Sequence, residues 1–547
     1  MKRVLIGHRG VGKSSLLVRH KEYFPGVPHF DLDQEIENQT QRKIYDIFTQ
    51  EGESYFRNLE LETFKRLISL NHFVISLGGG FSPQNIPKDI ETIFVSRRTD
   101  SDGRLFLGRP KINQQLSDLE DSLALYHRRH QHFLDRADFI YHMPEGINRF
   151  DELEKQILQS STSSVKAYRT VLKNTSEELL HHALELRTDI LTANEIQFIV
   201  KQYPQKSFLI SYRRSGDQIL NIPLATNILF DWALELGSPL SDFMRPANVL
   251  SIHDLSIEAA ITQFKKFPQI QLKLCPEIDS WDELILGYRW QQENPMARSF
   301  LPRTREGKSK FRWFRILATQ FQKINFVQSF IEMDDQPSFY DLMSLKYPTW
   351  GAVLGNPIHH SFSPIEQRII AVPLDEKDFA QALPFLTELG MRYAAVTSPL
   401  KTVAGNINSL AYKNGQWIKA STDQYGFKKL LEQIPAGLSH QVAVWGGEGV
   451  LPALKKVLPD LQCYSARTGT LKNTGPERTP EILIWAAPRF SGVKFPNWAP
   501  QIVLDLNYTA DSMGLECAKK FNCEYVSGLS MFLEQAKYQR EFWKENL

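Results

Sequence analysis

The residues most suited to a defined chemistry stand near the start of the chain, where the sequence GHRGVGKS occupies positions 7–14. Glycines let a backbone turn its N–H groups inward on phosphate oxygens, a lysine reaches the outer phosphates, and a hydroxyl binds Mg²⁺. The run follows an apolar segment and opens a segment of helical periodicity, as a phosphate-binding loop requires. The residues expected to hold ATP are Gly10, Val11, Gly12, Lys13, Ser14 and Ser15. The loop predicts transfer of a terminal phosphoryl group.

The elements around this loop alternate in the manner of an α/β protein. Short apolar runs at 4–7, 72–79 and 92–96 are separated by longer segments of helical periodicity, which predicts a parallel sheet. A second series of apolar runs lies at 208–212, 248–254 and 270–276, and each run ends in polar residues. Strands end in this way in barrels whose active sites lie at the strand ends. A third series includes a strand that enters a glycine-rich turn at 441–449. With a Ser/Thr-rich linker at 159–165, the pattern predicts three domains, at 1–160, 166–345 and 348–547.

Composition narrows the class of protein. The 547 residues exceed what one hydrophobic core organises, and 64 basic against 62 acidic side chains leave a net charge of +2, so no nucleic-acid partner is expected. The four cysteines form no CxxC pair and are too few for a disulfide framework, which fits a reducing cytoplasm. Since no apolar run of about 18 residues occurs, we expect neither a membrane span nor a cleaved leader.

Three features accompany the loop: FDLDQEI at 30–36, GESYFRNLE at 52–60 and three glycines at 78–80. With them the first domain resembles the shikimate kinases, which implies a three-layer P-loop fold, ATP and Mg²⁺. By that resemblance Lys13 and Asp33 are catalytic, and Ser14 and Asp31 hold Mg²⁺. The residues implied for phosphate or shikimate binding are Arg109, Asp33, Arg57, Gly79 and Arg129.

The middle domain resembles type I 3-dehydroquinate dehydratases through LELRTD at 184–189, SIHD at 251–254 and LKL at 272–274. The resemblance implies a (β/α)8-type barrel, complete or trimmed because the segment is short. Lysine forms an imine only as the free amine, which a partly buried strand end favours. Lys273 is therefore the expected imine-forming residue and His253 the general acid/base. The implied substrate contacts are Glu185, Arg187, Arg214, Gln336 and either Arg312 or Arg315.

The last domain resembles shikimate dehydrogenases, which implies two lobes, one of them a Rossmann-like subdomain for NADP(H). The motifs are GNPIHHSFSP at 355–364, VTSPLK at 396–401, GNINSL at 405–410, STDQYGF at 421–427 and GLSMFLEQA at 528–536. They imply Lys401 and Asp423 as the acid/base pair, with substrate contacts from Ser361, Ser363, Thr397, Asn408 and Gln535. The implied cofactor residues are Gly446, Gly447, Gly449, Arg467 and Thr468.

Two features depart from that pattern. Glu448 interrupts the glycine turn, where a carboxylate opposes the approach of a pyrophosphate. In the segment with Arg467 and Thr468, which resembles the part of the family that recognises the 2'-phosphate of NADP, the next arginine of the pattern is missing, and Lys472 can compensate for it.

The order of the three domains resembles the C-terminal part of the fungal pentafunctional arom protein, which implies successive steps from 3-dehydroquinate to shikimate 3-phosphate. The small-molecule substrates are the expected partners, and a homodimer is compatible with the resemblance. Two alternatives stay open. In one, the last domain is a non-catalytic scaffold beside an active kinase and dehydratase, while in the other the chain is a ligand sensor that resembles the fungal quinate repressor. Oligomeric state and transfer of intermediates between sites are not encoded in these motifs.

Overall fold

The computed structural model divides into two compact units, one formed by residues 1–98 and 125–345 and the other by 99–124 and 346–547, and each is described by itself. The structure describes residues 1–96, 118–143, 168–172, 181–204, 206–213, 227–237, 247–304, 310–327, 335–337, 349–355, 369–401, 403–432, 441–448, 450–472, 479–487, 492–507 and 512–547. The predicted domain boundaries near 160–166 and 345–348 lie outside the described residues.

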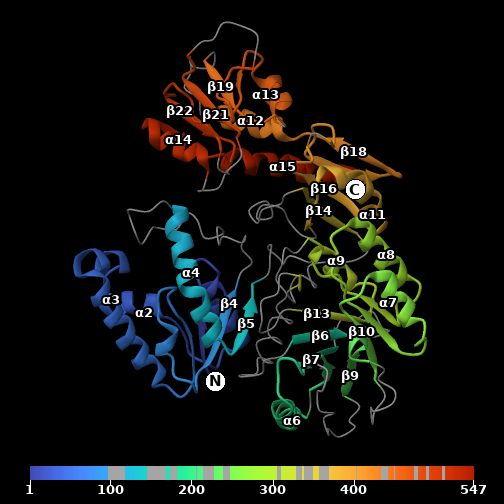
Figure 1. The fold of residues 1–547 in the computed structure, drawn as a ribbon. Helices are drawn as coiled ribbons and strands as arrows, with labels where there is room; N and C mark the ends of the chain where they lie inside the picture. Colours follow the sequence, from blue (N-terminus) through green and yellow to red (C-terminus); the bar gives the residue numbers. More distant parts are fainter. Residues whose placement is uncertain are drawn as a thin grey trace. The chain divides into compact units, whose positions relative to one another are not determined.

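The N-terminal sheet is parallel throughout, with the order β2-β3-β1-β4-β5 (Figure 1). Its strands are β1 (Lys2–Ile6), β2 (His29–Asp31), β3 (Phe73–Ser76), β4 (Glu91–Ser96) and β5 (Phe139–His142). Its helices are α1 (Lys13–Tyr23), α2 (Leu32–Thr40), α3 (Ile44–Ile68) and α4 (Asp118–Arg136). Alternate residues of β1 face opposite sides, so Val4 and Ile6 join the core under α2 and α3. The predicted three-layer kinase fold is confirmed.

The middle sheet has the order β12-β11-β10-β9-β8-β7-β6-β13. Its strands are β6 (Tyr168–Leu172), β7 (His181–Arg187), β8 (Phe208–Tyr212), β9 (Ile228–Ala233), β10 (Val249–Ile252), β11 (Gln271–Leu274), β12 (Arg298–Phe300) and β13 (Ile324–Val327). Strand β6 is antiparallel to both of its neighbours, and the remaining pairs are parallel. The helices described in this part are α6 (Ala193–Gln202), α7 (Ile257–Phe264), α8 (Trp281–Gln292) and α9 (Arg312–Ala318).

This sheet curls on itself without closing its backbone ladder among the described residues. Its two edge strands meet through side chains, because the Ile324 N–H donates to Ser299 Oγ at 3.1 Å and the Phe300 N–H to Gln322 Oε1 at 3.0 Å. On the inside, Lys273 Nζ of β11 lies 4.6 Å from the centre of the Phe326 ring of β13. The sequence left open a complete or a trimmed barrel, and the described residues are consistent with the trimmed form.

The C-terminal unit has two lobes, each built on one sheet. The first sheet is mixed, with the order β15-β14-β16-β17-β18, and comprises β14 (Trp350–Gly355), β15 (Ile369–Pro373), β16 (Met391–Val396), β17 (Ser409–Lys413) and β18 (Gln416–Ala420). The second is parallel and Rossmann-like, with the order β20-β19-β21-β22-β23, and comprises β19 (Val442–Trp445), β20 (Gln462–Tyr464), β21 (Ile482–Trp485), β22 (Ile502–Asp505) and β23 (Glu524–Val526). The two predicted lobes are confirmed.

Two helices join these lobes. Helix α12 (Asp423–Leu431) begins beside the first sheet and buries Phe427 and Leu430 in the core of the second. Helix α15 (Leu529–Asn546) returns from the second sheet to the first, where the Trp543 indole donates to Leu410 O at 3.1 Å (Figure 1). The other helices are α11 (Phe379–Glu388), α13 (Leu451–Val457) and α14 (Met513–Phe521). The lobes therefore share a framework on which a site between them can be built.

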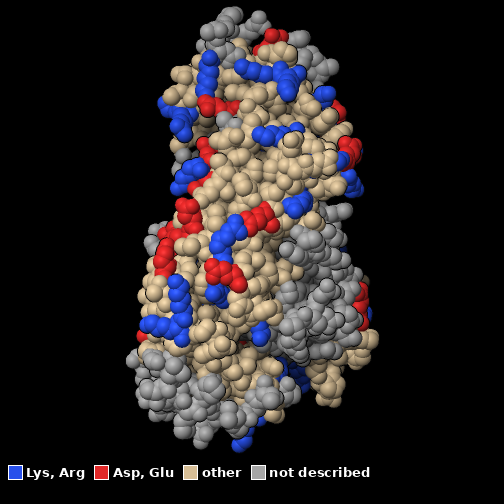
Figure 2. Space-filling model, turned by 90° about the vertical axis from the view of Figure 1, so that its right-hand side faces the viewer, with Lys and Arg blue, Asp and Glu red and all other residues tan. Residues whose placement is uncertain are grey.

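The described surface has no large region of one charge on the face shown in Figure 2, where Lys and Arg alternate with Asp and Glu. This distribution agrees with the net charge of +2. Among the described helices, none combines the length and apolar character that a membrane crossing requires.

Candidate functional site

Three groups of converging polar side chains occur among the described residues, and the first surrounds the loop between β1 and α1. Gly10 and Gly12 have φ angles of 80° and 99°, which side chains with a Cβ rarely adopt, so the backbone turns as a phosphate cradle requires. Lys13 opens helix α1, and its ammonium donates to Gly7 O and His8 O, both at 2.9 Å. The predicted loop is formed, with Lys13 lying across it.

Two acidic residues lie beside this loop at the end of β2. The Ser14 hydroxyl donates to Asp31 Oδ2 at 2.8 Å, so the two predicted Mg²⁺ ligands are neighbours. A hydroxyl and a carboxylate are oxygen donors suited to Mg²⁺, which takes few protein ligands when it also binds phosphates. Burial, together with the nearby charge of Asp31, raises the pKa of Asp33. Asp33 is therefore a stronger base than an exposed carboxylate.

Arginines converge on the glycine loop after β3. Arg129 Nη1 donates to Gly79 O at 2.8 Å, and Arg57 Nη1 donates to Glu60 Oε2 at 2.8 Å. A Cβ added to Gly80 would collide with the Arg57 guanidinium, so glycine makes room for that side chain. Burial and the neighbouring arginines lower the pKa of Arg129 to about 10. Such crowding of cations favours an anionic ligand, and Asp33 lies within the same electrostatic neighbourhood. Arg109 lies outside the described residues.

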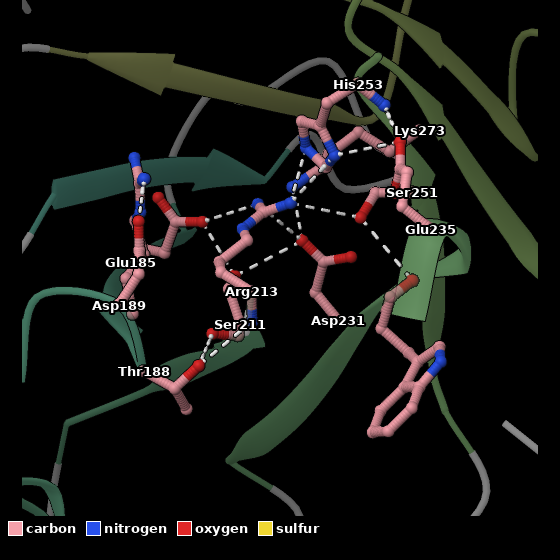
Figure 3. Close-up of polar contacts among 12 residues, drawn as sticks. Glu185, Thr188, Asp189, Ser211, Arg213, Asp231, Glu235, Ser251, His253 and Lys273 are labelled. Atoms are coloured by element: carbon pink, nitrogen blue, oxygen red, sulfur yellow. Dashed lines mark hydrogen bonds and ion pairs between the residues drawn. The ribbon is translucent and has the colours of Figure 1, made fainter. Parts of the chain in front are cut away.

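The second group lies inside the middle sheet, on the strands that carry Lys273 and His253 (Figure 3). Lys273 is 1 % exposed, and its ammonium contacts Asp231 Oδ2 of β9. Burial disfavours the Asp231 carboxylate, but the Lys273 and Arg213 cations outweigh it and hold the pKa well below its usual range. Asp231 Oδ1 has no hydrogen-bond partner among the described residues. One oxygen of this carboxylate thus balances Lys273, while the other remains available to a ligand or water.

Arg213 connects this ion pair with the rest of the group (Figure 3). Its guanidinium donates to Asp231 Oδ2 at 3.1 Å, to Ser251 Oγ at 3.2 Å and to Glu185 Oε1 at 3.3 Å. The same group contacts Nε2 of His253. Nδ1 of the same ring lies 3.2 Å from Arg213 Nη1, and because a guanidinium can only donate, the ring nitrogen that accepts from Arg213 carries no proton.

His253 is held from its other side by Glu235 of the short 3₁₀ helix Leu234–Leu236. Glu235 Oε1 accepts from the His253 backbone N–H and lies 3.7 Å from Nδ1 of its ring. Burial, followed by the charges of Arg213 and Lys273, holds the pKa of His253 well below its usual value. The ring is neutral at physiological pH and able to take a proton once Nε2 is released.

The other residues predicted for this site are distributed as follows. Glu185 belongs to the buried group, whereas Arg187 makes a two-point ion pair with Asp189, with distances of 2.9 and 2.5 Å. Arg312 Nε donates to the backbone O of Gln336 at 3.2 Å. Nε of the buried Arg315 and Oε1 of Gln336 have no hydrogen-bond partner among the described residues. Arg214 lies outside the described residues.

Sequence reasoning missed several residues of this group, namely Arg213, Ser211, Asp231, Ser251 and Glu235. A signal was present, because β8, β9 and β10 each carry a Ser or Asp within a largely apolar strand, as β11 carries Lys273. Register pairs Ser211 with Asp231, and Ser251 with Lys273. The choice between the two arginines of SYRRS needed the direction of the chain beyond β8, which the motif does not contain.

The third group lies in the C-terminal unit, where α12 begins. Lys401 Nζ lies 2.8 Å from Asp423 Oδ2, and Asn408 Nδ2 donates to Asp423 Oδ1 at 2.8 Å. Asp423 stands in the first turn of α12, where the helix dipole favours a carboxylate. Asp423 thus contacts both Lys401 and Asn408, so three of the predicted residues form one group. The Thr397 hydroxyl donates to Leu354 O at 3.0 Å, and the backbone O of Gln535 accepts from the Thr422 hydroxyl at 3.3 Å. Ser361 and Ser363 lie outside the described residues.

The predicted dinucleotide turn follows β19. Gly446 and Gly447 have φ angles of 81° and 72°, and a Cβ at Gly446 would lie 3.1 Å from Ala487 Cα. The backbone geometry therefore fits a close approach of phosphate. Glu448 points to solvent and pairs with Lys472 at 2.6 Å. Arg467 and Thr468 are exposed on the loop after β20, and Gly449 lies outside the described residues.

Comparison with known proteins adds to this geometry. The shikimate kinase family model matches residues 9–143. A shikimate kinase from Chlorobium limicola is 45 % identical over 83 residues, which are 15 % of this chain and 40 % of that protein. A shikimate dehydrogenase from Aquifex aeolicus has a similar structure, with a TM-score of 0.31 and 19 % identity over 37 % of this chain and 96 % of that one.

The chain spans only 40 to 51 % of the length of the first four curated relatives that it matches. A shikimate kinase from Aquifex aeolicus is covered almost completely, at 36 % identity over 176 residues, which are 29 % of this chain and 95 % of that protein. The matched segment contains the phosphate loop, Asp33, Arg57 and Arg129 in the arrangement described above. Through this N-terminal part, the chain belongs to the shikimate kinase family.

Proposed function

We propose that the chain is a multifunctional enzyme that converts 3-dehydroquinate through 3-dehydroshikimate and shikimate to shikimate 3-phosphate. The observation that carries the proposal is that three groups of converging polar side chains, around Asp33, Lys273 and Lys401, each combine a carboxylate with a cation, as three linked reactions would need. The reactions are a Schiff-base dehydration, a reduction by NADPH and a phosphorylation by ATP.

The kinase reaction is supported by family membership and by the group around Asp33. Arg57 and Arg129 bind the carboxylate of shikimate, and Asp33 orients the attacking hydroxyl and accepts its proton. Ser14 and Asp31 would hold Mg²⁺, and Lys13 would turn from the loop carbonyls to the phosphates. Bound ATP supplies the phosphoryl group, and Mg²⁺ offsets its negative charge.

The dehydration is supported by the contact network of Lys273 and His253. The Lys273 amine adds to the ketone of 3-dehydroquinate and, with loss of water, forms an iminium. His253 takes a proton from the neighbouring carbon, the β-hydroxyl leaves as water, and hydrolysis of the imine returns the amine and releases 3-dehydroshikimate. Glu235 accepts from the backbone N–H of His253 and thereby holds the segment that carries this base.

The reduction is supported by the contact between Lys401 and Asp423. A protonated Lys401 donates to the oxygen of the ketone as it becomes the hydroxyl of shikimate, and Asp423 keeps the ammonium in place. The Asn408 amide donates to the second carboxylate oxygen of Asp423 and so holds that side chain in place. NADPH, bound at the turn after β19, supplies the hydride.

The test is to assay the three reactions on one purified preparation of the full chain. Borohydride reduction in the presence of 3-dehydroquinate should attach the substrate to Lys273, as detected by peptide mass spectrometry, and Lys273→Met serves as the unlabelled control. NADPH oxidation with 3-dehydroshikimate and ATP-dependent phosphorylation of shikimate test the other two reactions. Unmodified Lys273 under saturating substrate would refute the imine mechanism.

A second candidate follows from Glu448, whose carboxylate lies at the turn where a phosphate would approach. In that case the chain dehydrates and phosphorylates, while the C-terminal unit binds substrate without reducing it. Absence of NADPH oxidation in a preparation with the other two activities would select this candidate.

A further inference from the structure

The turn after β19 and the loop after β20 are tied together by one ion pair. The loop runs out from Tyr464 and returns through a bridge between Tyr464 and Leu471, and the Lys472 N–H then donates to Cys463 O at 2.7 Å. This return places Lys472 beside β20, and its ammonium reaches Glu448 Oε1 at 2.6 Å. The pair thus spans the two segments at which a Rossmann-like lobe binds the phosphates of a dinucleotide.

The ion pair changes the charge that the site offers to a ligand. The hydrogen bond and charge of Lys472, with a smaller effect from Arg467, lower the pKa of Glu448, so it is an anion at neutral pH. Arg467 itself has no ion pair among the described residues. The charge of Lys472 is therefore neutralised by Glu448, whereas the charge of Arg467 is left for a ligand.

We propose that Glu448 sets the dinucleotide preference of the C-terminal unit, because its carboxylate holds Lys472 and must be displaced before Lys472 binds the ribose phosphate of NADP(H). The inference rests on the proposed reductase function. Lys472 lies on the same loop as Arg467 and Thr468, the residues implied for that phosphate. NAD(H) lacks this phosphate, so its binding does not require the pair to open.

Glu448 and Lys472 leave 81 and 39 % of their side chains exposed, so the pair is solvated and a phosphate can displace it. The effect on binding is therefore of modest size. An exposed charge pair corresponds to a factor of about two to five in affinity, and salt weakens it further. Backbone structure should be unaffected, because neither side chain contributes to the core.

The experiment measures dissociation constants of NADP+ and NAD+ by calorimetry on the full chain at low and at high salt. The variants are Glu448→Gln, Lys472→Gln and the double variant, with Glu516→Gln as the matched control. Glu516 forms a comparable exposed pair with Lys519 on α14, at 2.9 Å. Loss of the carboxylate also removes its repulsion of the pyrophosphate that both dinucleotides carry, so the diagnostic quantity is the ratio of the two dissociation constants. Glu448→Gln should shift this ratio about two- to fivefold in favour of NADP+ at low salt. The gain should disappear in the double variant and at high salt.

An unchanged ratio of the two dissociation constants in Glu448→Gln would overturn the inference while leaving the reductase proposal in place. Weaker binding of both dinucleotides would overturn it as well, since Glu448 would then be a direct ligand, for example of ribose hydroxyls. If none of the proteins bound either dinucleotide, the reductase proposal itself would fall, and this inference with it.

Discussion

Arg213 and Lys273 are buried cations in the middle sheet, and they share the carboxylate of Asp231. Removing one member of such a group leaves an unpaired buried charge, which costs more than the group contributes when it is complete. The side chains of this site are therefore coupled, and the protonation of His253 depends on its neighbours. A charge change at Arg213 is the most direct way to test that coupling.

Arg213→Gln should raise the pKa of His253. Burial lowers this pKa first and Arg213 is the next cause, so removing the cation stabilises the imidazolium. If the proposed dehydration uses His253 as its base, the acid limb of its rate should move to higher pH in the variant. NMR titration of the His253 ring checks the same shift without turnover. Arg298→Gln, which removes a pair with Glu293, is the control, and an equal shift there would contradict the assignment.

Gly80→Ala should weaken shikimate binding in the kinase. The added Cβ would press on the Arg57 guanidinium and displace it from Glu60. Loss of one charged hydrogen bond predicts a KM for shikimate raised at least roughly tenfold, with the KM for ATP unchanged. Gly26→Ala is the matched control, because a Cβ there meets no atom within 4 Å. Equal KM values for Gly80→Ala and wild type would show that Arg57 does not bind shikimate.

Among the elements, the strands were the most predictable. The apolar runs at 4–7, 208–212 and 270–276 became β1, β8 and β11, because local alternation of apolar residues is enough to indicate a strand. Strand direction was not predictable, since β6 pairs antiparallel with β7 and β13 while the other strands of the same sheet pair parallel. The residues of the site in the middle sheet divide in the same way, into those that the sequence indicates and those that only the fold brings together. Lys273 and His253 stand in motifs, whereas Asp231 reaches Lys273 only through the curl of the sheet.

Helix α15 supports the proposed reductase site although it is distant from that site in sequence. The buried Gln539 Nε2 donates to Asn408 O at 2.8 Å and to Ser409 Oγ at 2.9 Å. Asn408 in turn orients Asp423. The helix thus fixes the backbone that presents the acid/base pair, although no residue of α15 needs to react.

Gln539→Leu should loosen this segment and slow the reduction. Two acceptors would lose a buried donor, at a cost of about 1–3 kcal/mol in local stability. Hydrogen exchange of the peptide spanning 405–420 should accelerate, kcat for 3-dehydroshikimate should fall, and kinase activity should remain. Glu541→Leu, on the exposed side of the same helix, is the control. Unaltered exchange in Gln539→Leu would mean that α15 does not hold the site.

Over the whole molecule, each candidate site is built from the strands of its own sheet or, in the C-terminal unit, from two lobes joined by α12 and α15. The described residues form four sheets, and no backbone ladder connects one of these sheets to another. Separate cores lie under the N-terminal sheet, the middle sheet and the second sheet of the C-terminal unit. Since no reacting group is shared, loss of one site should not remove the chemistry of the others.

Replacing one lysine in each site therefore separates the three reactions. Lys13→Ala should abolish phosphorylation of shikimate, Lys273→Ala the dehydration, and Lys401→Ala should lower the reduction by a factor on the order of 10² to 10⁴, as expected for loss of a general acid. Each variant should keep the other two reactions within about twofold, as measured with the isolated substrate of each reaction. A variant that loses a second activity while its hydrogen exchange stays that of the wild type would show that the sites depend on one another. In a mixture of the three variants, 3-dehydroquinate should still become shikimate 3-phosphate, because intermediates that are released by one molecule can be used by the next.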